Sequence, residues 1–332
     1  MTIQTKPTQQ VKTFGDWANL AIAKHYKKII KTESGVIQDK DPEELHQMRV
    51  GMRRLRSAIA GFAPALDLPE TVSDKNIGKI ARILGKLRDL DVLQQTLTDP
   101  EGLFLLKEEQ KSSVKILKEL RKKRREALDE VRKTLKRNCY QNFKKDLKDW
   151  LEKPQYQKIG KISIYEVLPD LLLPEVSKLL IHPGWLVGVT IEEEKINIPE
   201  ELDREQVREL LETEEKNLHS LRKQAKRSRY NMELFTQFYG DSYEKFLKQI
   251  KQIQEVLGEI QDCVVLANFA SKIFGSADIN KEIPTLAAQL ATKRYQKWSE
   301  WIVLQRQFLD RQTKQDLRLV LQQPNSDIIL TY

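Results

Sequence analysis

The sequence contains few of the residues that mark several common protein classes. Only two of its 332 residues are cysteine, Cys139 and Cys263, and neither belongs to a Cys-x-x-Cys pair. This argues against a disulfide framework or a cysteine zinc site and fits a reducing compartment. The chain holds 13 glycines and 12 prolines and is rich in Leu, Lys, Glu, Arg and Gln. That composition predicts an all-α protein.

Long apolar runs are also missing. The longest, such as LPDLLLP, are much shorter than the roughly 20 residues that cross a bilayer, and the N-terminal stretch carries no apolar signal core. We therefore expect no membrane contact and a cytoplasmic location. There is no Gly-rich Walker loop, so nucleotide hydrolysis by that route is unsupported. No metal or cofactor is expected, because isolated acids without His or Cys ligands form no recognisable metal site.

Positive charge is present in excess. The formal net charge is +9, and a charge of this sign favours the anionic classes of partner in general: polyphosphate, nucleic acid, acidic protein or a membrane surface. Residues 115–148 hold fourteen Lys and Arg against five Asp and Glu. Leucines at helical spacing predict that this segment packs, with most of its charges on a solvated face. Three of its arginines are candidates for secondary contacts to an anion: Arg121, Arg125 and Arg132.

A basic segment occurs twice. Residues 45–62, LHQMRVGMRRLRSAIAGF, have a near-copy 173 residues later at 218–235, LHSLRKQAKRSRYNMELF. The same offset relates LGKLRDLDVL at 84–93 to LGEIQDCVVL at 257–266. Two elements in constant register predict an internal duplication. In each copy a His is followed by bases at +3, +7, +8 and +10: His46, Arg49, Arg53, Arg54 and Arg56, then His219, Arg222, Lys226, Arg227 and Arg229.

On a helical wheel, this basic stripe adjoins the apolar stripe instead of opposing it. No acid lies between residues 45 and 60 or between 216 and 229. Cations at the edge of a core are partly desolvated and repel one another unless an anion lies among them. Arginine and lysine at this spacing suit a row of phosphates. The alternative for one such helix alone is an ordinary solvated face, and the matched duplication weighs against it.

Proline, glycine and apolar patterns predict the order of elements. Asp41, Pro42 and the glutamates after them mark a helix start, and Gly35 is expected to end the region before it. Residues 153–202 are interpreted as a connector with the entry helix of the second repeat, and 185–198 is the only stretch with β character. Helices are expected over residues 13–31, 42–68, 73–97, 101–152 as one or two, 203–238, 242–274 and 284–321. Residues 1–12 and the tail 322–332 are expected to be disordered or frayed.

The simplest architecture is two pseudo-symmetric four-helix bundles, with a first repeat over 13–152 and a second repeat reaching 321. The two basic rows would then form a central groove or cavity of positive potential. Lys24 and Lys28 are candidate additional contacts. His46 and His219 either pack against a neighbouring carboxylate or donate to phosphate, which would make binding pH-sensitive. Asp89 and Asp262 are expected to orient a base of the preceding helix or to be surface acids.

The doubled His-x-x-Arg motifs at 46–56 and 219–229, with Arg-Asp-Leu-Asp-Val at 88–92, resemble the conserved-histidine α-helical (CHAD) domain family over about residues 13–321. The resemblance implies two bundles around a basic cavity, binding of inorganic polyphosphate, association with polyphosphate granules and no catalysis. The resemblance implies that polyphosphate is bound by the residues at the motif positions of both copies, with Lys223 among them. The second copy departs from the first at Gln261 and Cys263, so the halves need not contribute equally. Glu193 and Lys195 do not complete the Glu-x-Glu-x-Lys motif of linked triphosphatases.

The sequence therefore predicts a non-enzymatic, cytoplasmic polyphosphate-binding protein. The first alternative is a nucleic-acid-binding protein, which the 7% aromatic content disfavours, because single-strand binders supply stacking platforms. The others are a polyphosphate-processing enzyme or accessory subunit, and a helical adaptor whose basic face docks an acidic protein.

Overall fold

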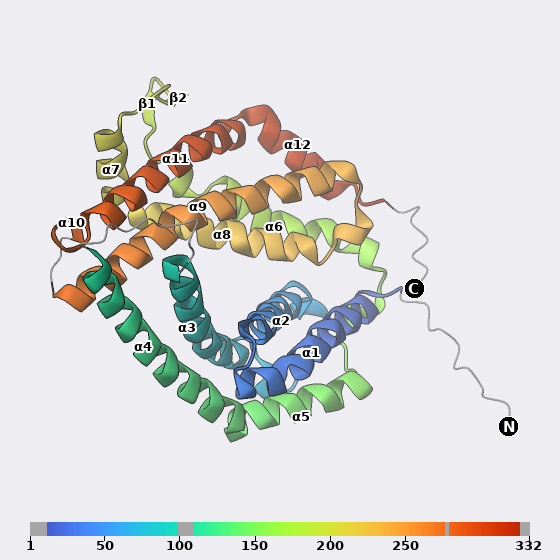
Figure 1. Cartoon of the computed structure of the whole chain (residues 1–332). Coiled ribbons are helices and arrows are strands. Elements are labelled where there is room, and N and C mark those ends of the chain that lie inside the picture. Colours follow the sequence, from blue (N-terminus) through green and yellow to red (C-terminus); the bar gives the residue numbers. More distant parts are fainter. Residues whose placement is uncertain (1–11, 99–108, 276–278, 326–332) are drawn as a thin grey trace. The chain divides into compact units, whose positions relative to one another are not determined.

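The computed structural model describes residues 12–98, 109–275 and 279–325, which Figure 1 draws as coloured ribbons. These residues form twelve α-helices and a single two-stranded hairpin. The all-α prediction is confirmed. The predictions for residues 1–11, for 101–108 and for the end of the tail fall outside the described residues.

The chain folds into two compact units, each made of separated segments. Unit 1 comprises Met1–Arg82 and Lys133–Leu171, and unit 2 comprises Ile83–Arg132 and Leu172–Tyr332. Helices α3 (Asp74–Thr98) and α4 (Gln110–Lys136) therefore each contribute residues to both units. The repeat boundaries and the pseudo-symmetry of the bundles stay predictions.

Unit 1 is built on a pair of helices, α1 (Phe14–Gln38) and α2 (Pro42–Gly61), which lie side by side (Figure 1). As predicted, Asp41 caps α2, and its carboxylate accepts a hydrogen bond of 2.8 Å from the backbone N–H of Glu43. Helix α2 ends before residue 68, and short 3-10 turns follow it. Helix α5 (Asn138–Glu152) completes the unit. Buried side chains from α1 and α2 form its core: Ile22, Ile29, Met48, Met52 and Leu55.

Gly35 does not end the first helix. Helix α1 continues to Gln38, and Asp39 closes it in the left-handed conformation with φ 56°. A Cβ atom on Gly35 would lie 2.5 Å from Cγ of Glu44 on α2. The glycine is therefore needed for the close approach of α2, which a pattern of breakers along the sequence does not reveal.

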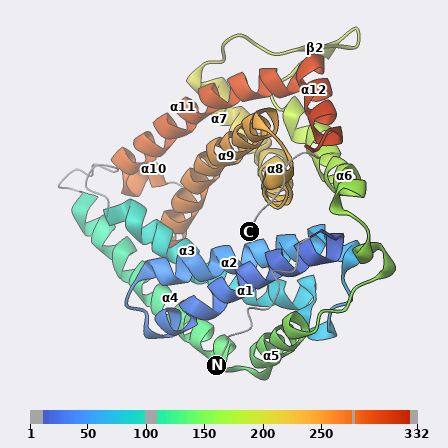
Figure 2. The ribbon, with the colours of Figure 1, turned by 90° about the vertical axis from the view of Figure 1, so that its right-hand side faces the viewer.

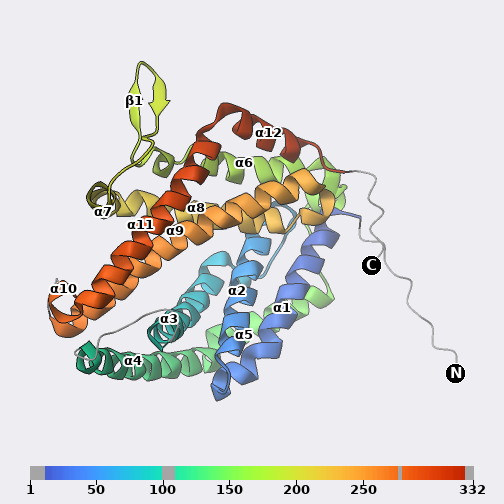
Figure 3. The ribbon, with the colours of Figure 1, turned by 45° about the horizontal axis from the view of Figure 1, so that its top comes forward.

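Unit 2 is organised around the longest helix, α9 (Asp241–Phe274), against which α8 and α11 pack (Figure 2). A hairpin of β1 (Thr190–Glu192) and β2 (Lys195–Asn197) extends from the unit (Figure 3) and confirms the β character expected there. The other helices are α6 (Leu168–Leu180), α7 (Arg204–Thr213), α8 (Glu215–Glu233), α10 (Ile279–Glu282), α11 (Pro284–Leu309) and α12 (Arg311–Gln322).

Two helices predicted to be continuous are interrupted. The segment 203–238 divides into α7 and α8 at Glu214, and the segment 284–321 divides into α11 and α12 at Asp310. The Asp310 carboxylate accepts a hydrogen bond of 2.7 Å from the N–H of Thr313 and so starts a new helix. Apolar residues continue at helical spacing on both sides of each break, which explains why periodicity alone joined the pieces.

The apolar stripe of α4 is buried, as expected. Ile116 and Leu120 belong to a core cluster in unit 2 that also contains Leu93 of α3, Leu266 of α9 and Leu286 of α11. This cluster fixes the first half of α4 and its charged face on unit 2.

Candidate anion-binding site

The first basic row lies on α2 in unit 1. His46, Arg49, Arg53, Arg54 and Arg56 are all half-buried, and they alternate along the helix with the fully buried Leu45, Met48, Met52 and Leu55. The predicted position of the cations, at the edge of the core, is confirmed for this helix. A half-buried guanidinium retains its charge but loses part of its hydration, which strengthens its attraction for an anion.

Arg54 extends this row to α1. Burial and the charges of Arg54, Lys24 and Lys28 lower the pKa of His25 to about 4. Burial and Arg54 also lower the pKa of the Lys28 ammonium. The structure thus brings the two candidate lysines of α1 into the field of the α2 row, and their role as additional contacts stays a prediction. The neutral, buried His25 beside them is a feature that sequence reasoning did not assign.

Arg56 has a partner inside the protein. Its Nε and Nη2 atoms donate to the two carboxylate oxygens of Asp74 at 2.8 and 3.0 Å. Gly78 of α3 permits this arrangement, because a Cβ there would lie 3.2 Å from Cζ of Arg56. This two-pronged ion pair ties α2 to α3 and leaves Arg56 with less capacity for a ligand than the motif suggests.

The second basic row lies on α8 in unit 2. Gln224 and Ser228 donate hydrogen bonds to the carbonyl of Glu175 on α6, so this side of α8 faces the protein. The bases beside it range from exposed to buried. Lys223 and Arg227 are exposed, His219, Arg222 and Lys226 are half-buried, and Arg229 is buried.

Arg222 packs against α9 beside Gly258. Its side chain is 18% exposed, and the nearest carboxylate oxygen, Oδ1 of Asp262, is 3.9 Å from Nη2. That separation is an ion pair but too long for a hydrogen bond. A Cβ on Gly258 would lie 3.2 Å from Nε of Arg222, so the glycine makes room for the guanidinium. The buried Nε donates to no acceptor among the described residues.

His219 is close to these cations. Burial and the charges of Lys223 and Arg222 lower the pKa of its imidazole. Its buried Nδ1 has no hydrogen-bond partner in the described part of the chain. A carboxylate partner at Nδ1, one of the two roles considered for this residue, is therefore not found within that part.

Arg229 pairs within its own helix. Its Nε is 3.4 Å from a carboxylate oxygen of Glu233, and its guanidinium lies 4.5 Å from the centroid of the Tyr230 ring. Arg56 and Arg229 occupy the same +10 position of the two motifs, and both face an acid. The ion pairs at +10 make these two arginines weaker candidates for ligand contact.

The remaining candidates are spread over unit 2. Asp89 is exposed on α3, while Arg121 and Arg125 are exposed on α4. Arg132 lies 3.9 Å from Asp129, one turn earlier on α4. The expected central groove is a relation between the two units and stays a prediction.

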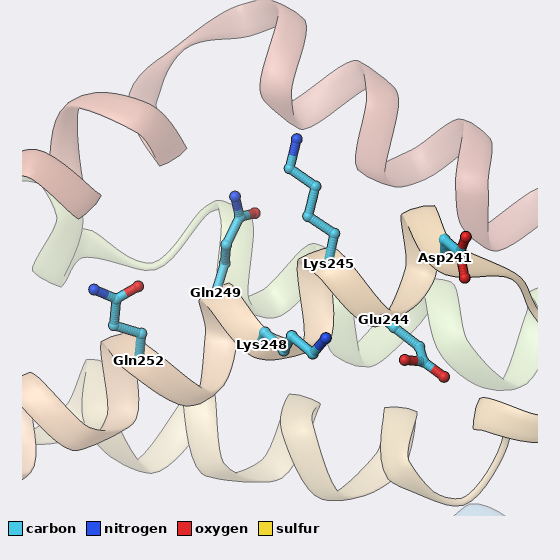
Figure 4. A pocket seen from close by; sticks show the side chains of 6 residues that line it. All are labelled: Asp241, Glu244, Lys245, Lys248, Gln249 and Gln252. Carbon is cyan, nitrogen blue, oxygen red and sulfur yellow. The ribbon is translucent and has the colours of Figure 1, made fainter.

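A separate hollow lies along the first turns of α9 (Figure 4). Lys245 and Lys248 extend in different directions from the helix, and the acids Asp241 and Glu244 are also among the lining residues. This balance of charges does not favour a polyanion. Within the described residues, no three His, Cys, Asp or Glu side chains gather closely enough to hold a metal ion. No described helix combines the length and the apolar character needed to cross a membrane.

Comparison with known proteins identifies the family. The sequence model of the CHAD domain matches residues 20–271. The chain belongs to the CHAD domain family. The structure is similar to the crystal structure of a CHAD domain from the plant Ricinus communis, with a TM-score of 0.57, 21% identity, and coverage of 97% of this chain and 96% of the other. It is also similar to PptA from Streptomyces chartreusis, with a TM-score of 0.59, 14% identity, and coverage of 92% and 99%.

No curated protein matches this CHAD chain. At these identities the two solved structures support the fold, and the residues of the basic rows are assigned from this chain's own geometry. One signal for the glycine that accommodates Arg222 was already in the sequence, since Gly258 keeps register with Gly85 across the two copies.

Proposed function

We propose that this CHAD protein binds inorganic polyphosphate, without hydrolysing it, through the basic rows of α2 and α8. The main contacts are the bases at +3 and +7: Arg49, Arg53, Arg222 and Lys226. The two histidines and the flanking bases of the motifs contribute around them. Association of the protein with polyphosphate granules would follow from this affinity.

The observation that carries the proposal is Arg222. A guanidinium with a buried Nε that has no acceptor among the described residues, and with its nearest carboxylate 3.9 Å away, is incompletely satisfied. A buried donor without an acceptor costs about 1–3 kcal/mol. Phosphate oxygens would relieve this cost, because they accept charge-assisted hydrogen bonds from the planar fork of arginine.

Linear polyphosphate fits the rows better than a nucleic acid does. Bases at +3, +7 and +10 follow the helix over about 10 Å at about 1.5 Å per residue, which suits consecutive phosphates. Tyr230 is the only aromatic side chain in the two basic runs, and the Arg229 guanidinium lies over its ring. That ring is not available as a stacking platform of the kind that single-strand binders use.

The test is a combined variant, R49Q/R53Q/R222Q/K226Q, titrated with long-chain polyphosphate at two salt concentrations. Glutamine keeps helix propensity close to that of arginine and lysine. We expect affinity to fall by at least about 100-fold, and the salt dependence to become shallower because fewer counterions are released. Far-UV circular dichroism should show unchanged helicity.

The matched control removes four exposed lysines, two from each unit, in K145Q/K148Q/K245Q/K248Q. It changes the net charge equally but leaves both rows intact, so its affinity should stay within a few-fold of the wild type. Equal losses of affinity in the two variants would mean that net charge alone explains the effect, and would refute the assigned site. Release of phosphate from polyphosphate in the presence of Mg²⁺ or Mn²⁺ would contradict the non-catalytic part of the proposal.

A further inference from the structure

A second basic hollow lies between α4 and the end of α9. In Figures 1 and 3 the start of α4 and the end of α9 lie beside each other, and both belong to unit 2. The hollow has a volume of about 500 Å³. Six cations and a single acid are among its lining side chains: Lys115, Lys118, Lys122, Lys123, Arg125, Lys272 and Glu119, with Ile273 as the apolar member.

The cations on α4 repeat the spacing of the two motifs. Counted from Lys115, the others stand at +3, +7, +8 and +10, the positions that bases occupy after His46 and His219. No His begins this third row, and it is not part of the duplicated sequence. At about 1.5 Å per residue, the row from Lys115 to Arg125 is about 15 Å long.

Among the residues that the structure describes, these cations have no ion-pair partner. Within the described residues, none of the six has a carboxylate oxygen within the 4.0 Å of an ion pair, although Glu119 lies among them. Their neighbour Arg124 differs, since its Nε donates to Asp91 at 2.7 Å. Six like charges around one hollow repel each other. An anion bound among them would attract all six and make the electrostatic energy of the hollow favourable.

The row is also held in place. Ile116 and Leu120, which separate its members along α4, are 1% and 0% exposed in the core of unit 2. The ammonium groups of Lys115 and Lys123 lie 4.9 and 5.1 Å from the ring centroids of Phe274 and Phe269. Both rings pack against that core. A row on a fixed helix loses less conformational freedom on binding than free surface lysines do.

We propose that this hollow is a second binding groove for a linear chain of phosphates, lined by none of the residues of the α2 and α8 rows. The ligand class is that of the proposed function, on which this inference rests. Phosphates are favoured over nucleic-acid bases because the two nearby rings are packed against the core and covered by lysines, which leaves no platform for stacking. The groove gives the protein a second point of attachment on a long polyphosphate, which raises avidity without changing either site.

The test compares K118Q/K122Q/R125Q with a control, K111Q/K133Q/K136Q, which removes three exposed lysines of the same helix outside the hollow. Calorimetric titration with short polyphosphate should show two classes of site in the wild type and in the control. The groove variant should lose one class, with affinity there reduced at least about tenfold at low salt. If groove variant and control behave alike, there is no groove site.

A second measurement locates the site directly. Long-chain polyphosphate should protect Lys118 and Lys122 from acetylation in the intact protein, as read by mass spectrometry, and should leave Lys133 and Lys136 reactive. Equal reactivity of all four with and without polyphosphate would overturn the proposal. Protection by single-stranded DNA stronger than by polyphosphate, at equal phosphate concentration, would also overturn it and make the groove a nucleic-acid site.

The two proposals fail separately. The combined α2 and α8 variant should retain the groove class of binding. If that variant binds like the wild type while the groove variant binds nothing, the proposed function's site is wrong and the groove stands. If the groove variant is unaffected while the combined variant loses all binding, only the groove is refuted.

Discussion

Replacing Gly258 with alanine should raise stability and weaken polyphosphate binding at the same time. Gly258 lies inside α9, where alanine is favoured over glycine by about 0.8–1 kcal/mol. The added Cβ would lie 3.2 Å from Nε and 3.3 Å from Nη2 of Arg222. The end of a flexible side chain can move by the few tenths of an ångström required, so most of the gain in helix stability should remain.

The displacement of the Arg222 side chain lowers affinity only for a ligand that contacts the guanidinium in its present position. A hydrogen bond to a charged group contributes about 1.5–3 kcal/mol, and we expect the displaced guanidinium to lose about half of one. That corresponds to a fall in affinity of about fivefold. The thermal midpoint should rise by up to about 3 °C for a unit of this size.

The assay pairs differential scanning fluorimetry with a polyphosphate titration at low salt. The matched control is G78A, which places a Cβ 3.2 Å from Cζ of Arg56, the arginine that already pairs with Asp74. That variant should leave affinity within about twofold of the wild type. If G258A is stabilised and still binds normally, the position of Arg222 has no part in ligand binding and the reasoning from its unsatisfied Nε is refuted.

Three further predictions follow. Affinity for polyphosphate should increase as pH falls below about 6.5, the ordinary pKa of histidine. Burial and neighbouring cations lower the pKa of His219 in the free protein. A bound polyanion raises that pKa, so binding takes up a proton. Titrations from pH 8 to pH 5 should show a smaller increase of affinity in H219Q than in the wild type. The free energy of unfolding should fall from pH 6.5 to pH 4 by up to about 3 kcal/mol. The cause is His25, since burial first, and then the charge of Arg54, hold its pKa in the folded protein at about 4. Chemical denaturation of H25Q should not show this pH-dependent loss of stability. R56Q should lower the free energy of unfolding by about 0.5–1 kcal/mol, as the loss of an exposed ion pair does, and leave polyphosphate affinity nearly unchanged. If the loss of binding free energy exceeds the loss of stability, Arg56 contacts the ligand.

Local signals predicted much of the fold. Asp41 with Pro42 located the start of α2, because a capping side chain and a proline act within one turn. The bounds of α3 and α9 were predicted to within about one residue. The breaks at Glu214 and Asp310 were missed, since a helix can stop and restart without disturbing the apolar period.

The site was predictable only in part, for a different reason. The stripe of bases beside the core follows from spacing along one helix, and it is present on α2. Whether a base has a partner depends on another helix, and no spacing on α2 indicates that Asp74 at the start of α3 meets Arg56. The same is true of Gly35, whose role is set by Glu44.

The comparison of equivalent positions within the chain separates bases that support the fold from bases available to a ligand. Arg56 and Arg229, at +10, face Asp74 and Glu233 at 2.8 and 3.4 Å. Arg222, at +3, has a side-chain exposure of 18%, between those of Arg229 at 10% and Arg56 at 39%, yet its closest carboxylate is 3.9 Å away. A largely covered cation that served only the fold would be expected to have a closer acid, because an incompletely paired charge with little hydration is destabilising. The cost is tolerable if an anion satisfies the guanidinium when it binds, and that is the physical basis for assigning Arg222 to the ligand.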